Sequence, residues 1–345
     1  MTFDSRPVRF EPAWWCRNAH AQTMWPTLFR PRRPIAYRRE VVDLPDGDFL
    51  DLDWLAGAKD SPVAVLIHGL CGNSRSSYIR GLAAALNRCG YTVAAMNQRG
   101  AGGRPNRRPR TYHSGHTEDL DHLLGVLAER HPARPVVCAG FSLGGNLLLK
   151  WLGENPLSHN VAAAVAVSVP FVLSEAAQRM NRGFSRVYRS HLLGGLKRAA
   201  RRRRELLACR FDPAALDARD FQSFDDALTA PVNGFVDAAE YYALCSSRRF
   251  LGRITTPTLV IQSRDDPFMT ESVIPTPDEL SASVRLELYD RGGHVGFVAG
   301  YAPGRSRYWL EDRITTYFEA ALGSRRDRDE RCSGASAPRE VRTTS

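Results

Sequence analysis

Residues 135–145 read PVVCAGFSLGG, and this stretch decides the fold. A short apolar run typical of a buried β-strand leads directly into Gly140-Phe141-Ser142-Leu143-Gly144, and a helical pattern begins at Leu143. A strand, a Gly-x-Ser-x-Gly turn and a helix in this order are typical of a nucleophile elbow, whose tight turn admits only small residues at 140 and 144. Such a turn exposes the serine Oγ at a helix N-terminus, where developing negative charge is favoured. The stretch therefore predicts Ser142 as a nucleophile.

Outward from this elbow, strands and helices alternate along most of the chain. Apolar β-runs bounded by turn residues alternate with segments of helical spacing, which predicts a mostly parallel sheet covered by helices on both faces. The expected strands are 63–67, 91–96, 135–139, 161–169, 258–262 and 284–289, and the expected helices are 78–89, 117–130, 143–153 and 306–322.

The remaining segments set the expected domain limits. Residues 1–35 show no clean period and predict an irregular arm, while 36–322 form the catalytic domain, opened by a strand hairpin around Pro45-Asp46-Gly47. Residues 171–255 are helical in pattern and almost free of strand signals, so we expect a helical cap over the carboxyl edge of the sheet, where such sheets bind ligands. The polar, charged tail 323–345 is expected to be disordered.

Two backbone amides are candidates for binding an oxyanion. His68-Gly69-Leu70-Cys71-Gly72 directly follows the 63–67 strand, and in an elbow-type enzyme the loop at this place supplies one N–H group. The residue after the nucleophile supplies the other. We therefore assign the amides of Leu70 and Leu143, and we expect His68 to be a structural histidine bonded to backbone.

An acid and a base follow the serine in the chain. Asp265-Asp266-Pro267-Phe268 comes just after the 258–262 strand, and Gly292-Gly293-His294 comes just after the 284–289 strand. A serine needs a base to take its proton, and the base needs an acid that orients it. The order Ser142, Asp, His294 suits this triad. We favour Asp266 as the acid, with Asp265 as the alternative.

Composition and charge limit the classes of partner and cofactor that we expect. The net charge is +10, and Arg198, Arg201, Arg202, Arg203 and Arg204 form a dense basic run, which we interpret as a solvated helix face. Without interleaved aromatic residues it does not predict nucleic-acid binding, although peripheral membrane contact through the basic cap stays open. Seven cysteines without a CxxC pair, no apolar leader at the N-terminus and no nucleotide or metal motif predict a cytoplasmic protein without cofactor or metal.

Taken together, the motifs resemble the YheT-like family of α/β-hydrolases, a group described as esterases and related to the eukaryotic ABHD lipid hydrolases. The resemblance extends from about residue 15 to 320, but residues 171–255 match no motif of the family. It implies the α/β-hydrolase fold and a triad on Ser142, Asp266 or Asp265, and His294. The matching stretches are NAHAQT (18–23), HGLCGNSRSSYIRGL (68–82), NQRG (97–100), YHSGHTEDL (112–120), AGFSLGGN (139–146), DDPF (265–268) and GGHVGF (292–297).

The expected function is hydrolysis of small-molecule or lipid carboxylic esters through an acyl-enzyme. Apolar residues of the cap suit either a short- or medium-chain acyl pocket or plain core packing: Phe171, Leu173, Phe184, Leu192 and Leu193. An acyltransferase that moves the acyl group to an alcohol is the alternative, because it uses the same triad. The sequence does not indicate an oligomeric state.

Overall fold

The computed structural model describes residues 9–31, 34–155, 160–207 and 212–334, with the side chains of 324–334 left aside. Its centre is an eight-stranded sheet in the order β1-β2-β4-β3-β5-β6-β7-β8. The strands from β4 onward pair in parallel, whereas β2 runs antiparallel to both β1 and β4. The parallel strands therefore end along one common edge. The strands are β1 (Arg38–Asp43), β2 (Phe49–Leu55), β3 (Val63–Ile67), β4 (Thr92–Asn97), β5 (Val136–Phe141), β6 (Val161–Val167), β7 (Thr258–Ser263) and β8 (Val284–Tyr289).

Alternate residues of each central strand enter opposite cores. In β3, Val63, Val65 and Ile67 pack in one core, while Ala64 and Leu66 face the other. This follows from the two-residue period of a strand, and it explains why buried parallel strands consist of continuous apolar runs. Helices α3 (Thr117–Arg130) and α4 (Leu143–Glu154) cover the first face, and α2 (Ser77–Arg88) and α12 (Trp309–Gly334) cover the second.

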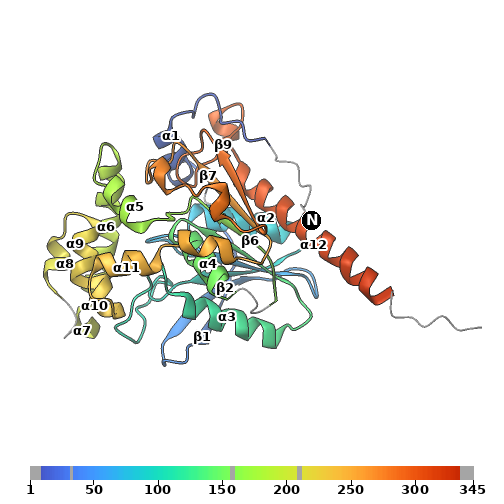
Figure 1. Cartoon of the computed structure of the whole chain (residues 1–345), viewed down its shortest axis with the longest axis horizontal. Helices are drawn as coiled ribbons and strands as arrows, with labels where there is room; N and C mark the ends of the chain where they lie inside the picture. The colour runs from blue at the N-terminus through green and yellow to red at the C-terminus, as the bar shows by residue number, and fades with distance from the viewer. Residues whose placement is uncertain (1–8, 32–33, 156–159, 208–211, 335–345) are drawn as a thin grey trace, which may run out of the picture.

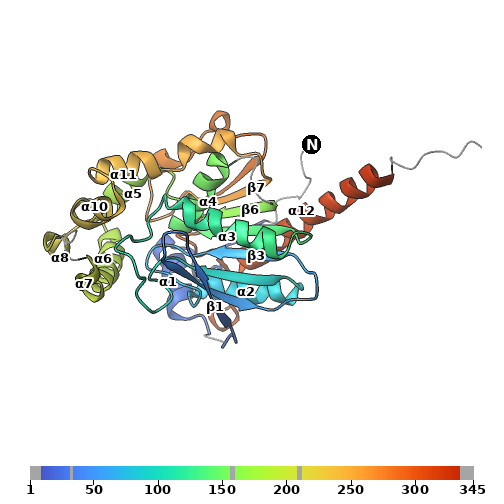
Figure 2. The ribbon, with the colours of Figure 1, turned by 90° about the horizontal axis from the view of Figure 1, so that it is seen from below.

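A cap of short helices lies at one end of the molecule, on the left in Figures 1 and 2. Between Glu175 and Glu205 its sequence holds nine Arg and one Lys and no acidic residue. The cap has its own apolar core, which includes Met180, Leu193 and Phe224. Its helices are α5 (Leu173–Arg179), α6 (Ser185–Arg202), α7 (Arg204–Leu207), α8 (Ala214–Asp217), α9 (Phe221–Phe224), a π-helical turn (Asp225–Thr229), α10 (Ala230–Asn233) and α11 (Ala238–Cys245).

Both ends of the chain depart from expectation. The arm expected to be irregular contains α1 (Ala19–Leu28), whose first turn is capped by Asn18 Oδ1, which accepts from the amides of His20 and Ala21. The closing helix α12 continues to Gly334, so residues 323–334, expected to be disordered, are helical; Arg and Glu in this stretch are strong helix formers. The rest of the expected tail lies outside the described residues.

The arginine run of the cap also differs from a uniformly solvated face. Arg198, Arg201, Arg202 and Arg204 are exposed, but Arg203 is buried. A four-residue run of arginines at a helix end must turn one side chain inward, because a helix presents successive residues about 100° apart.

The expected α/β fold, with its mostly parallel sheet and helices on both faces, is confirmed. Within the described part of the chain, no helix combines the length and apolar character that crossing a bilayer requires.

Candidate active site

Ser142 occupies a strained turn between β5 and α4. Its φ of 52° and ψ of −120° lie in a region that residues with a Cβ seldom adopt. The flanking glycines allow this turn: a Cβ on Gly140 would lie 2.4 Å from the carbonyl oxygen of Gly144, and a Cβ on Gly144 would lie 2.5 Å from that of His68. The turn thus presents the Ser142 hydroxyl at the carboxyl edge of the sheet.

Three side chains from separate loops meet at this edge. Ser142 Oγ lies 3.0 Å from His294 Nε2, and His294 Nδ1 lies 2.8 Å from Asp266 Oδ2. Both His294 and Asp266 are largely shielded from solvent, with side-chain exposures of 9% and 1%. The ring of Phe268 stacks on the imidazole at 3.9 Å between centroids and 7° between planes, which limits its rotation. These contacts are those that transfer of the Ser142 proton to His294 requires.

The neighbouring Asp265 makes a different hydrogen bond. Its Oδ1 accepts from the amide of Gly293 at 2.9 Å, so it braces the turn that carries His294 and does not contact the imidazole. Burial raises the pKa of Asp265 above its ordinary value, and its hydrogen bonds partly offset this rise. Asp266 therefore occupies the position of the expected triad acid.

The loop after β3 brings Leu70 beside Leu143. Both residues line the same pocket as Ser142 and His294, and among the described residues neither amide has a hydrogen-bond acceptor. The neighbouring amides are occupied, because Gly69 donates to the Tyr78 hydroxyl at 3.0 Å and Cys71 to the Tyr112 hydroxyl at 2.9 Å. Two free N–H groups therefore remain beside the serine.

His68 is hydrogen-bonded to the backbone of this loop and to the backbone that follows β4. Its Nε2 accepts from the amide of Gln98 at 3.1 Å, so the proton sits on Nδ1, which donates to the carbonyl of Gly69 at 2.8 Å. Complete burial lowers the pKa of His68 to about 4, which keeps the ring neutral. The expectation of a backbone-bonded His68 agrees with these contacts.

The N-terminal arm supports the loop of His294. Thr23 Oγ1 donates to the carbonyl of Ala19 at 2.7 Å and accepts from the amide of His294 at 2.9 Å. Gln22, fully buried, accepts from the amide of Val298 at 2.6 Å. These contacts were not foreseen. The NAHAQT stretch was the one available signal, since an irregular arm has no reason to carry such a motif.

A partly open, mostly apolar pocket extends from Ser142 beneath the cap. Of the cap residues expected near an acyl chain, Leu173 and Leu192 line it, whereas Phe171 and Leu193 are buried in the cores and Phe184 is exposed. Further apolar walls come from α5, α6, α9 and the loop after β7: Ala176, Ala177, Met180, Leu196, Phe221, Phe224, Leu228, Phe268 and Met269.

Polar groups also reach this pocket at its margin. Arg99, just after β4, lines it but is fully engaged: its Nε and Nη2 each donate to Asp119 at 2.7 Å, and its Nη1 donates to Asp46 at 2.6 Å. Asp225 lines it as well and accepts from the Tyr242 hydroxyl at 2.7 Å, while burial raises its pKa to about 6. Among the described residues, no group of three or more His, Cys, Asp or Glu side chains has metal-binding geometry.

Comparisons with known proteins agree with this architecture. A family model described as "alpha/beta hydrolase fold" matches residues 62–301. The Escherichia coli (strain K12) protein named "Putative esterase YheT" is 41% identical over 331 residues, which cover 92% of this chain and 96% of that protein. The mouse protein named "Phospholipase ABHD3" is 29% identical over 326 residues, covering 91% of this chain and 78% of that protein.

A solved structure shares the fold at low sequence identity. The esterase Pf2001 of Pyrococcus furiosus superposes with a TM-score of 0.54 at 16% identity, covering 84% of this chain and 90% of that one. The sheet order, the Ser142 elbow and the extent of the matches to the family and to YheT lead to one conclusion. This chain belongs to the α/β-hydrolase fold family and, within it, to the group of YheT and its relatives.

Proposed function

We propose that this protein hydrolyses carboxylic esters, with Ser142 as nucleophile, His294 as general base and acid, and Asp266 as the acid that orients His294. The observation that carries the proposal is the continuous contact from Ser142 Oγ through the imidazole to Asp266. The names of the two relatives, an esterase and a phospholipase, favour esters over other acyl compounds.

The reaction proceeds in two halves. Ser142 Oγ attacks the ester carbonyl carbon while His294 Nε2 accepts the hydroxyl proton, and the carbonyl oxygen becomes an oxyanion. The oxyanion accepts from the amides of Leu70 and Leu143, each worth about 3–4 kcal/mol of transition-state stabilisation. His294 then protonates the departing alcohol. Water, deprotonated by His294, attacks the acyl-enzyme and releases the acid, which restores the Ser142 hydroxyl.

The acyl chain occupies the apolar pocket beneath the cap. Leu173 and Met180 come from α5 and its end, and Leu192 and Leu196 come from α6, so the chain lies between the cap and the sheet edge. The walls of this pocket are mostly apolar, which supports acyl esters as substrates, and we propose short or medium acyl chains.

The test is hydrolysis of p-nitrophenyl esters from acetate to laurate by wild type and Ser142→Ala. We expect kcat of the variant to fall by about 10⁴-fold or more, since the remaining site only binds and polarises the ester. Alanine keeps the Cβ of serine, so the strained turn is unchanged. Ser190→Ala on the exposed face of α6 is the matched control and keeps full activity. Equal activity in Ser142→Ala and wild type would overturn the assignment.

Added ethanol distinguishes hydrolysis from acyl transfer. With water as the acceptor, ethyl esters form only in proportion to the ethanol present. Preferential formation of ethyl esters at low ethanol would assign acyl transfer as the main reaction.

A further inference from the structure

The cap places one arginine in the pocket wall without a carboxylate. Arg203 follows the last residue of α6, is only 8% exposed and lines the same pocket as Ser142. Its Nη2 donates to the carbonyls of Arg108, Pro109 and Arg110 at 2.8, 3.0 and 3.1 Å. Its Nε is buried without an acceptor, and its Nη1 has none among the described residues. Arg203 therefore keeps unused donors.

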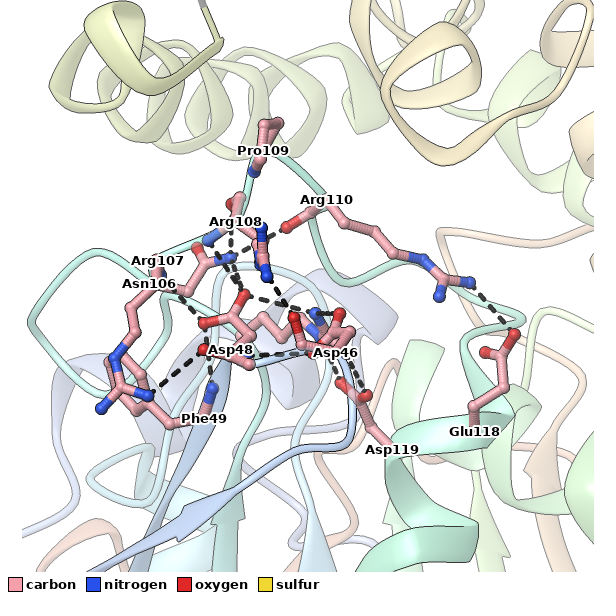
Figure 3. Close-up of polar contacts among 12 residues, drawn as sticks. Asp46, Asp48, Phe49, Asn106, Arg107, Arg108, Pro109, Arg110, Glu118 and Asp119 are labelled. Carbon is pink, nitrogen blue, oxygen red and sulfur yellow. Dashed lines mark hydrogen bonds and ion pairs between the residues drawn. The ribbon is translucent and has the colours of Figure 1, made fainter.

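No acid within the described chain pairs with this guanidinium. The carboxylate of Asp48 does attract the Arg203 charge, but it is already occupied by other donors, as Figure 3 shows. Asp48 Oδ1 accepts from the amides of Phe49 and Arg107 at 2.9 Å each, and its Oδ2 accepts from Asn106 Nδ2 at 2.7 Å. Asp48 thus accepts from the backbone amides of Arg107 and Arg108, while Arg203 binds the carbonyls of 108–110.

The surroundings otherwise disfavour the charge of Arg203. Burial lowers its pKa to about 10, and the Arg99 cation contributes in the same direction. An ionised group without a counter-charge in an apolar pocket costs several kcal/mol, and an anionic ligand offsets that cost. The three carbonyl oxygens accept from only one of the three guanidinium nitrogens of Arg203, which is Nη2.

Arg203 and Ser142 line the same pocket, so one bound molecule can contact both residues. The segment it binds is fixed to Asp48, directly before β2, whereas Ser142 directly follows β5. These strands are three positions apart in the sheet, with β4 and β3 between them. Apolar residues of α6 line the pocket, among them Leu192, Leu196 and Ala200.

We propose that Arg203 receives an anionic group, a carboxylate or a phosphate, which the ester substrate carries on an apolar arm, so that the enzyme selects acidic esters over neutral esters of equal length. The proposal rests on the proposed ester hydrolysis and adds the substrate class. Arg203 acts as a specificity-determining residue, because its Nε and Nη1, which have no acceptor among the residues that the structure describes, are donors for a charge-assisted hydrogen bond.

Two pairs of probes test this preference and locate the acid. The first compares p-nitrophenyl alkanoates with mono-p-nitrophenyl esters of dicarboxylic acids of equal length. The second compares one acyl chain on glycerol with the same chain on glycerol 3-phosphate. We expect kcat/KM of wild type to be about tenfold or more higher for the acidic member of at least one pair. A preference in the first pair assigns the acid to the acyl side, and one in the second pair assigns it to the alcohol side.

Variants distinguish anion recognition by Arg203 from its structural role, which is to bind the backbone carbonyls of 108–110. Arg203→Met should bring the ratio of acidic to neutral kcat/KM close to one, and Arg203→Lys should restore part of it. Arg202→Met, the exposed neighbour, should keep the wild-type ratio. A loss of this structural role alone lowers kcat/KM for both members of a pair equally, so an unchanged ratio in Arg203→Met would overturn the inference.

A binding measurement keeps this test independent of turnover. Calorimetry of wild type with an alkyl phosphate, an alkyl carboxylate and the alcohol of equal length should show tighter binding of at least one anion, lost in Arg203→Met. Equal affinities would overturn the inference even if no ester were hydrolysed. Hydrolysis of neutral and acidic esters at equal rates would overturn it while leaving the proposed function intact.

Discussion

Three buried histidines are held neutral, and this ties stability to pH. Burial lowers the pKa of His68 to about 4 and of His116 to about 3, and it lowers that of His113 well below its usual value. In the unfolded chain each titrates near 6.5, so between this value and about 4 the unfolded state binds more protons. The stability they contribute is therefore complete above pH 6.5 and is lost as the pH falls.

The expected loss is about 1.4 kcal/mol of unfolding free energy per pH unit for each histidine in this window. His116 offers the clearest variant, because within the described chain neither of its ring nitrogens has a hydrogen-bond partner; the oxygens of Asp119 and Glu118 lie 3.5 and 3.6 Å from its Nε2. His116→Phe keeps the stacking with His113 and should reduce the slope of unfolding free energy against pH by about one proton. Urea unfolding from pH 7 to 4 measures it, with exposed His191→Phe as the control. An unchanged slope in His116→Phe would contradict the prediction.

At this same scale, the sequence predicted most of the side chains that the structure brings together around Ser142. Ser142 and His294 each sit in a motif at the end of an expected strand, and the structure brings them together with Asp266. Their chemical roles stay predictions. The choice between Asp265 and Asp266 needed coordinates, since adjacent residues of a loop point in different directions. The sequence did not single out Arg203, because nothing in a run of identical arginines marks the one whose side chain turns inward.

Helix α1 contacts the backbone of His294 itself through the Thr23 hydroxyl. Thr23→Val preserves the shape of the side chain but leaves the amide of His294 without its acceptor. Because His294 must stay aligned with both Ser142 and Asp266, we expect kcat to fall roughly tenfold to a hundredfold while KM changes little. Thr23→Ser retains the hydroxyl and should restore kcat. Steady-state kinetics on the best p-nitrophenyl ester measures both; wild-type kcat in Thr23→Val would show that the arm does not position His294.

The elements that the sequence missed are those stabilised from outside. Helix α1 is short and includes Pro26, so its own pattern is weak; a side-chain cap at Asn18 and the contacts of Gln22 with Val298 support it. The central strands were predictable because burial on both faces demands continuous apolar runs. The cap was predictable as helical, but its division into short helices depends on how each packs on the sheet edge.

For the whole molecule, α12 combines a packed half with a projecting half. Its core residues extend from Trp309 to Leu322, and in Figure 1 the end of the helix, in red, runs beyond the body. A chain that ends at Gly323 should therefore keep kcat/KM and thermal midpoint close to those of the full chain. A chain that ends at Arg313 loses Tyr317 and Phe318 from the core and should fail to fold. A large loss of stability in the first truncation would assign a structural role to residues 324–345.

The stretch of the cap between Glu175 and Glu205, which contains no acidic residue, affects how a substrate approaches the pocket as well as how it binds there. With ten cationic residues between Glu175 and Glu205 and a net charge of +10, we expect a positive electrostatic potential over α6. Such a field steers anions in solution before any contact forms, and it weakens as ions screen it. For an acidic ester the second-order encounter rate would then fall with ionic strength, whereas a neutral ester would arrive at the same rate in dilute and concentrated salt.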